Sequence, residues 1–220
     1  MPIGMGGKTI ADVAIDVKRT FGDEAGIQIN DTDIIRWVGE AEREILITNP
    51  ILKAVATTYV TAGVSEYDIT DIEMFSIQSI RFNGVKLEYR SFQEAEEYIM
   101  NDDPKGEASG DPQMWYEWGG TIILYPSPSS DSPDALKIYY VREPPAFNDV
   151  TNTLHVPNKY YPNIVQYVLA KAYEMDEDQS SSQLKMNQFN ARLGTLSEAE
   201  NSDNGMDTYP RITIREEDAW

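Results

Sequence analysis

The stretch that decides the fold is DPQMWYEWGGTIILYPSPSSDSPDALKIYYVREPP, residues 111–145. Gln113–Trp118 and Thr121–Tyr125 have the pattern of β-strands, and the Gly119-Gly120 pair between them supplies the positive φ angles that a tight hairpin needs. A third strand is predicted over Ala135–Arg142, where apolar residues alternate with polar or aromatic ones and a proline pair follows. We therefore expect a β region at the centre of the chain.

Four more strands are predicted upstream of this stretch, because the apolar period there is two. They are residues 54–60, 65–69, 74–82 and 85–89. The turns Ala62-Gly63 and Asn83-Gly84 separate neighbouring strands, and the second is the dipeptide most typical of a hairpin. We expect the four strands to form a meander. Ser91 and Glu94 then form a capping box for a short helix that ends near Met100.

Helical periodicity is confined to the two ends of the chain. Thr9 is the expected N-cap of a first helix that ends at Gly22, and a second helix is expected from the capping residues 30–32 to about Thr48. Two more helices follow Pro157 and residues 180–182. On the second helix the charged residues are expected to form a mostly solvated face; they are Arg36, Glu40, Glu42, Arg43 and Glu44.

The order of these elements predicts an α+β fold. Neither pair of helices can bury its apolar stripe alone, so we expect one helical bundle built from both ends of the chain, residues 1–52 and 150–197. An antiparallel β domain with one short helix, residues 53–149, is inserted between them. Residues 198–220 lose the periodicity and are expected to form an extended C-terminal arm.

The composition excludes several classes of protein. With 18 Lys and Arg against 37 Asp and Glu, the formal charge of −19 repels phosphate backbones and argues against an ordinary nucleic-acid reader. The acidity either keeps the chain soluble or lets a polyanion pass without binding. The absence of cysteine rules out disulfides and thiolate metal sites, and no apolar run is long enough to span a bilayer.

Catalytic motifs are missing, so we expect no enzyme, no metal site and no cofactor. The single histidine, His155, is interpreted as a capping or packing residue. Gly7-Lys8-Thr9 lacks the upstream glycine of a phosphate loop, because position 2 is Pro2. The acidic residues 102–111 lack the spacing of a calcium loop. An aromatic platform around Trp115 and Trp118 would suit a sugar, although cross-strand packing is the favoured interpretation.

The C-terminal segment offers candidate partner-binding residues. They are Tyr209, Ile212, Ile214 and Trp220, which stand among polar and acidic neighbours. Such a segment can be a disordered end, an edge strand on its own sheet, or an arm that docks on a partner. The residues alone leave these possibilities open.

Several stretches taken together resemble the head-to-tail adaptor, or connector, family of tailed bacteriophages, of the podoviral tail tubular protein A type. The matching stretches, within about residues 9–196, are VSEYDIT, SIRFNGVKL, SFQEAEEYI, DPQMWYEWGGTIILYPSPSS, ALKIYYVREPP and the returning helices that begin at LHVPNKYYPNIVQYV. The resemblance lies in the order and spacing of these stretches.

The resemblance implies a structural virion protein without catalytic residues. It implies a ring of about a dozen copies at the head–tail interface, assembled in the host cytoplasm. The partners would be the portal protein, the distal tail or nozzle protein and other copies of the chain. The C-terminal arm would grip the portal, with Tyr209, Ile212, Ile214 and Trp220 as anchors. DNA would pass through the ring without sequence-specific binding, and no membrane would be involved. A tail-terminator or tail-completion protein and a carbohydrate-binding tail module are the alternatives.

Overall fold

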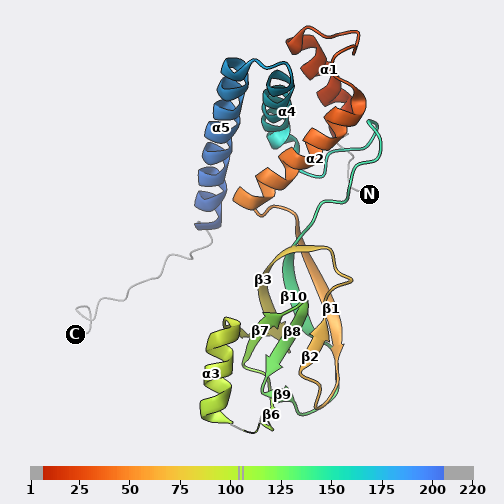
Figure 1. The fold of residues 1–220 in the computed structure, drawn as a ribbon. Helices are drawn as coiled ribbons and strands as arrows, with labels where there is room; N and C mark the ends of the chain where they lie inside the picture. Colours follow the sequence, from red (N-terminus) through yellow and green to blue (C-terminus); the bar gives the residue numbers. More distant parts are fainter. Residues whose placement is uncertain (1–6, 104, 106, 206–220) are drawn as a thin grey trace, which may run out of the picture. The chain divides into compact units, whose positions relative to one another are not determined.

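The structure is a computed structural model that describes residues 7–103, 105 and 107–205, except for the side chains of 200–205. It divides into two compact units (Figure 1). The helical unit comprises the described residues up to Asn49 and from Pro144 onward, and the β unit comprises Pro50–Glu143. The fold is α+β, as the sequence predicted, with helices from both ends of the chain in one unit and the β unit inserted between them.

The first two helices begin and end where the sequence predicted. Helix α1 spans Ile10–Phe21, with a reciprocal capping box between Thr9 and Asp12, and ends at Gly22 in the left-handed conformation. Helix α2 spans Asp31–Thr48 and is capped by the side chain of Asn30. Their apolar stripes are buried, which is the reason why both helices need a partner.

The partner is α4, Tyr161–Met175, which follows the 3₁₀ turn η1, Asn158–Tyr160. Figure 1 shows α4 between α5 and the N-terminal pair, and it packs against all three helices. Helix α5, Gln179–Gly205, continues past residue 197, where the sequence predicted its end. Glu and Ala are good helix formers, and no Pro or Gly interrupts 198–204, so the backbone hydrogen bonds continue to Gly205.

The β unit contains two four-stranded sheets. The first sheet has the order β1-β10-β3-β4, with β1 Lys53–Val60, β10 Ser132–Arg142, β3 Met74–Phe82 and β4 Val85–Lys86. The second has the order β2-β8-β7-β5, with β2 Glu66–Asp68, β8 Thr121–Tyr125, β7 Met114–Trp118 and β5 Glu88–Tyr89. The strands β6, Ser109–Gly110, and β9, Ser127–Pro128, form a small parallel pair, and β5 pairs with β7 in parallel as well.

Both predicted hairpin turns form as expected. Gly119 and Gly120 have φ angles of 59° and 80° between β7 and β8, and Asn83 and Gly84 have φ angles of 48° and 84° between β3 and β4. Two consecutive positive φ angles characterise the turn type whose twist matches that of the strands. The central hairpin therefore owes its register to glycine.

The predicted meander was wrong. The strands β1 and β2 do not pair, because β10 pairs with β1 along its length and β2 pairs with β8 in the other sheet. The expected strand 85–89 is two short strands in different sheets, separated by the buried Leu87. The strands β1 and β10 are far apart in sequence, and the alternation of apolar and polar residues along one strand does not indicate such a distant partner. The pairing therefore depends on apolar burial in the folded unit.

The two sheets of the β unit pack face to face around an apolar core. It includes Ile80, Phe82, Leu136 and Ile138 from the first sheet and Trp115, Ile122 and Leu124 from the second. Helix α3, Phe92–Asp102, lies on the other face of the second sheet, where Ala95 contacts Met114, Tyr116 and Tyr125. The β unit therefore has three layers: α3, the second sheet and the first sheet.

Candidate interaction surfaces

The single histidine is held by a buried carboxylate. Glu42 on α2 is 0% exposed, and its Oε1 accepts hydrogen bonds from the backbone N–H groups of His155 (2.7 Å) and Val156 (3.3 Å). Its Oε2 lies 2.8 Å from Nδ1 of His155, whose ring stacks on Phe147 with 4.5 Å between ring centroids. The packing interpretation of His155 is therefore the one that the geometry supports.

This contact corrects the expectation for Glu42, which was placed on the solvated face of its helix. A carboxylate without water needs several donors to be tolerated, and here the returning chain supplies them. The sequence gives no local signal for it, because the donors are backbone groups more than a hundred residues away. Through these hydrogen bonds Glu42 holds the segment before α4 against α2.

Further polar contacts position α4 and the turn before it in the helical unit. The Asn49 amide donates to the Tyr160 hydroxyl (3.1 Å), which joins the end of α2 to η1. The Tyr161 hydroxyl donates to Asp16 Oδ2 of α1 at 2.6 Å; burial, and then this bond, raise the pKa of Tyr161. The Asn163 amide donates to the Phe189 carbonyl (3.2 Å), which joins α4 to α5.

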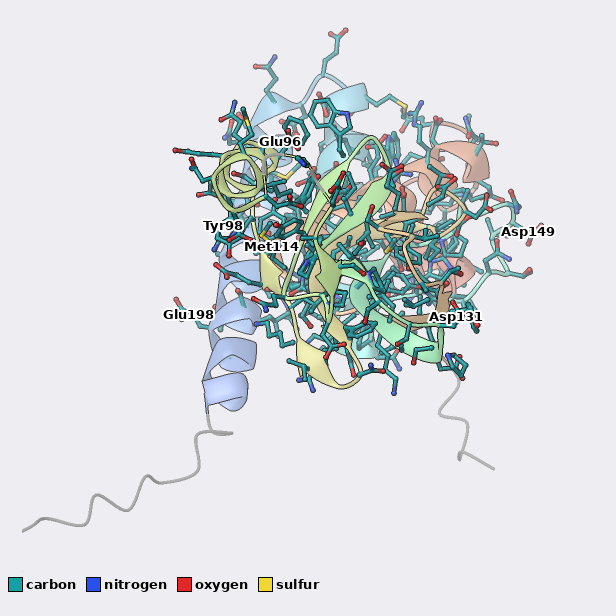
Figure 2. The ribbon with its side chains drawn as sticks, turned by 90° about the horizontal axis from the view of Figure 1, so that it is seen from below. Glu96, Tyr98, Met114, Asp131, Asp149 and Glu198 are labelled. Carbon is teal, nitrogen blue, oxygen red and sulfur yellow. The ribbon has the colours of Figure 1, made fainter. Side chains whose placement is uncertain are left out.

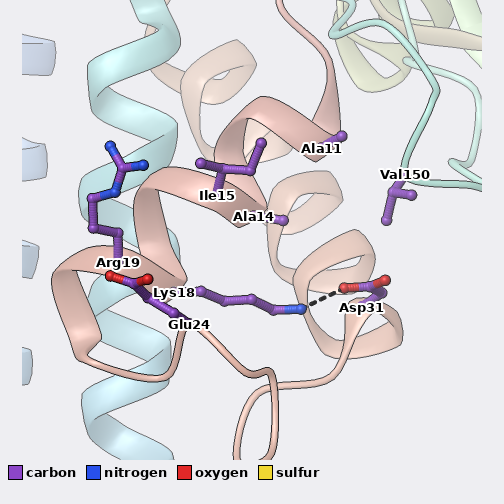
Figure 3. A pocket seen from close by; sticks show the side chains of 8 residues that line it. All are labelled: Ala11, Ala14, Ile15, Lys18, Arg19, Glu24, Asp31 and Val150. Carbon is purple, nitrogen blue, oxygen red and sulfur yellow. Dashed lines mark hydrogen bonds and ion pairs between the residues drawn. The ribbon is translucent and has the colours of Figure 1, made fainter.

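The helical unit carries a recess beside α1 (Figure 3). Its volume is about 330 Å³, and it is lined by Ala11, Ala14, Ile15, Lys18, Arg19, Glu24, Asp31 and Val150. The Lys18 ammonium is already bound to Asp31 at 2.7 Å, so its charge is matched, while Ile15 is 57% exposed. The recess suits an apolar side chain of a partner more than an anion.

A second, more open groove of about 620 Å³ runs between α4 and α5. It is lined by Pro162, Gln166, Gln188, Ala191, Arg192, Thr195 and Leu196. Phe189 and Leu193 lie on the buried side of α5 and hold it to α4, so the groove walls are fixed by packing. The two recesses are candidate surfaces for protein contacts.

The aromatic residues of the central hairpin do not form a sugar platform. Trp115 is 4% exposed and packs in the core between the sheets, next to Tyr89 at 4.8 Å between ring centroids. Trp118 is 61% exposed but stacks on Phe92 of α3 at 4.3 Å. Trp115 is therefore a core residue and Trp118 packs on Phe92 at the surface, which agrees with the packing interpretation.

The acidic residues of the loop after α3 have structural partners. Asp102 accepts a hydrogen bond from the Tyr125 hydroxyl (3.0 Å), and Asp103 accepts one from the backbone N–H of Ala108. Burial and the neighbouring Asp102 raise the pKa of Tyr125 to about 12. Within the described residues, no group of His, Asp and Glu side chains is arranged to hold a metal ion.

The predicted anchors of the C-terminal arm, Tyr209, Ile212, Ile214 and Trp220, lie outside the described residues. The concave surfaces of the helical unit were not predicted from the sequence, because the residues that line them come from separate elements. The exposed Ile15, at a position of α1 between buried ones, is the one local signal for the recess.

A family model described as SU10 adaptor protein matches residues 8–213, which include parts of both units. The chain belongs to the SU10 adaptor family. The match confirms the resemblance to phage head-to-tail adaptors, and this adaptor therefore has a structural role that implies contacts with other head and tail components of a virion. No curated protein matches the chain significantly.

In this adaptor the one histidine is engaged by Glu42. The helices of the described part of the chain include none that is long and apolar enough to cross a membrane. The family name implies a structural role that is not enzymatic.

Proposed function

We propose that this protein forms the ring that joins the portal of a phage head to its tail. In this role several copies, about a dozen, surround the channel through which DNA leaves the head. The portal protein contacts one end of the ring, and the distal tail or nozzle protein contacts the other. The protein is a virion component that assembles in the host cytoplasm before DNA ejection.

The observation that carries the proposal is the extent of the family match. Residues 8–213 include the whole β unit and all the described helices, so the match extends over both units of the chain. A protein that must bind two different neighbours and its own copies needs several separate surfaces. Two compact units, with recesses on the helical one, supply them.

The charge supports a channel through which DNA passes. A formal charge of −19 on each copy gives a strongly negative ring, and like charges form no lasting contacts with phosphates. DNA can then slide without being held. Carboxylates on the outer surface of the ring and Lys or Arg along its bore would contradict this part of the proposal.

The C-terminal arm is proposed to bind the portal, with Tyr209, Ile212, Ile214 and Trp220 as apolar anchors. Deleting residues 206–220 should weaken portal binding and leave the circular dichroism of the folded units unchanged, because the deletion begins after α5. A replacement of the four anchors by Ser in the full chain is the matched variant. Full portal binding by both variants would refute the assignment.

The deciding experiment is electron microscopy of the purified protein mixed with the portal ring of the same virus. We expect a second ring stacked coaxially on the portal, whose copies can be counted. Separate portal rings and free 24.9 kDa protein would refute the adaptor ring. The same preparation with isolated tail tubes is the control, because a tail-terminator protein would bind there instead.

A further inference from the structure

The outer face of the first sheet carries a row of positive charges. Lys137 on β10 lies directly opposite Arg81 on β3, and Arg81 lies directly opposite Lys86 on β4. All three side chains are exposed. Neighbouring strands are roughly 5 Å apart, so the three cations stand side by side across the sheet.

This row is unfavourable for the isolated protein. Like charges directly opposite each other destabilise a sheet, and in the described residues none of the three has an ion-pair partner. The chain has twice as many acidic as basic residues, 37 against 18, so three adjacent cations without a carboxylate are not explained by composition. An external partner that carries negative charge would explain them.

The same face also exposes apolar side chains. In the next row Val55 lies opposite Tyr139, and Tyr139 lies under the Arg81 guanidinium at 5.6 Å. Val55 and Tyr59 on β1 are 54% and 52% exposed. A surface that combines cations with exposed apolar groups is typical of a protein contact, where the apolar groups give affinity and the charges give orientation.

A complementary surface exists on the opposite side of the β unit. Helix α3 has the sequence FQEAEEYIMND, with the acidic residues Glu94, Glu96, Glu97 and Asp102 and no Lys or Arg. It also exposes Tyr98 and Met100, the latter at 70%. Figure 2 shows Glu96 and Tyr98 on this helix, beside Met114 of the second sheet.

The layer order of the β unit separates the two surfaces. Helix α3 packs on one face of the second sheet, the first sheet packs on the other face, and the cations are on the far side of the first sheet. A single copy therefore cannot bring them together. In two copies, the acidic helix of one can reach the basic sheet of the next, and the same contact can repeat. Such a heterologous contact closes into a ring when its rotation closes.

We propose that α3 of one copy docks on the outer face of the first sheet of a second copy, with Glu96 and Glu97 against Arg81, Lys86 and Lys137. Met100, one turn of the helix from Glu96 and Glu97, then lies against the apolar row that contains Val55. The proposal names the contact that builds the ring and so rests on the proposed function. It also removes the basic row from the path of DNA, because a neighbouring copy covers it.

DNA is the competing ligand for the basic row. It is disfavoured because the same chain carries a charge of −19, and because Val55, Tyr59 and Met100 would remain exposed in a contact with phosphates alone. The acidic helix accounts for both the charges and the apolar groups.

Cross-linking tests the contact directly, because the chain has no cysteine. The variant with Lys137→Cys and Glu97→Cys is treated with a short bis-maleimide, alone at high concentration and low salt, and again with portal rings. A ladder of covalent dimers, trimers and larger species is expected. Each single variant, and the pair Lys137→Cys with Glu117→Cys, is the control, and these should give no ladder. Absence of a ladder in both conditions overturns the proposal.

Charge reversal gives an independent test. Arg81→Glu with Lys137→Glu, and Glu96→Lys with Glu97→Lys, should each weaken self-association about tenfold or more, since each places like charges across the contact. A mixture of the two variants should associate again, because each supplies the face that the other lacks. The first variant keeps a like-charged pair between positions 81 and 137 and places a carboxylate at position 81 opposite Lys86, so the free energy of unfolding of each variant is measured beside its self-association.

The outcomes separate this contact from the adaptor role. Stacked rings on the portal without a ladder, or a mixture that fails to recover, would overturn the contact and leave the adaptor role intact. A ladder without stacked rings would support the contact and refute portal binding.

Loss of DNA binding in the Arg81→Glu, Lys137→Glu variant with unchanged self-association would assign the basic row to DNA and overturn the proposal. In Lys159→Glu with Lys185→Glu, a control of equal charge change on the helical unit outside both recesses, self-association should be unchanged.

Discussion

The helical unit and the β unit are held together by different means. All four polar or charged side chains that are buried in the described part of the chain belong to the helical unit: Asp23, Glu42, Asn49 and Asn163. The core between the two sheets consists of apolar residues alone. The unit assembled from the two distant ends of the chain therefore uses buried polar contacts, and the unit assembled from a continuous segment does not.

The difference has a physical reason. Apolar stripes on helices can slide or rotate against one another at a small cost, whereas a buried carboxylate is tolerated only where its donors are. We infer that Glu42 selects one docking of the returning segment on α2. In the β unit, hairpin turns and the backbone ladder already define the register, so apolar packing is sufficient.

Replacing Glu42 with Ala should produce the greatest loss of stability. The change leaves the buried backbone N–H group of Val156 and the part-buried one of His155 without an acceptor, and each buried donor left unpaired costs about 1–3 kcal/mol. The free energy of unfolding from urea titration measures the loss. Glu44→Ala, on the exposed side of the same helix, is the control and should change it by less than about 0.5 kcal/mol. Equal effects would contradict the contrast between the units.

Replacing Leu136 with Ala should destabilise the β unit by about 3 kcal/mol, since the side chain is fully buried and leaves a cavity. Peptide-resolved hydrogen exchange should show faster exchange in β1, β3 and β10 and unchanged protection in α4. Faster exchange in both units would show that the helical unit and the β unit unfold together. Their stabilities could then not be compared separately.

The two capping boxes offer a matched pair of small changes, one in each unit. Thr9→Ala at α1 and Ser91→Ala at α3 should each cost about 1 kcal/mol, because each removes an acceptor for a backbone N–H group at a helix start. Hydrogen exchange should localise each loss to its own helix. A much larger loss for Thr9→Ala would mean that the start of α1 also holds the return segment, which it meets at Thr153.

Acid should weaken the helical unit through Asp23. The backbone N–H of Ile29, followed by those of Ile27 and Gln28, lowers the pKa of this carboxyl below its ordinary value of 3.8. The resulting stability is fully present above the ordinary pKa and is lost as the pH falls through the lowered one. Asp23→Asn should therefore flatten the pH dependence of unfolding in this range. Asp68→Asn in the β unit, an exposed carboxyl with one backbone donor, should flatten it less.

Most element boundaries could be predicted because their signals are local. Thr9 with Asp12, Asn30 and Ser91 with Glu94 are caps that act within one turn of a helix, and Asn83-Gly84 and Gly119-Gly120 act within one hairpin. The α+β class followed from their order. Strand partners could not be predicted in this way, because β1 pairs with β10 through core burial and not through a turn.

The candidate surfaces depended even more on distant residues. In the sequence, Glu42 cannot be distinguished from an exposed charged residue on a helix. Its hydrogen-bond donors are the backbone N–H groups of residues 155 and 156, which only the fold brings to it. The row of Lys137, Arg81 and Lys86 exists only through the register of β10, β3 and β4. A sequence shows three separate cations, and only the paired strands show that they are neighbours.

The pairing of β1 with β10 has a mechanical consequence. The chain enters the β unit at β1 and leaves it at β10, and Lys53 lies directly opposite Val141 at this end of the pair. A force that separates these two ends would therefore open the β1–β10 ladder from that end, one residue pair after another. Because the two ends are neighbours, a short loop could also replace residues 50–143 without disturbing the ends it joins. The β unit is thus a removable part of the chain.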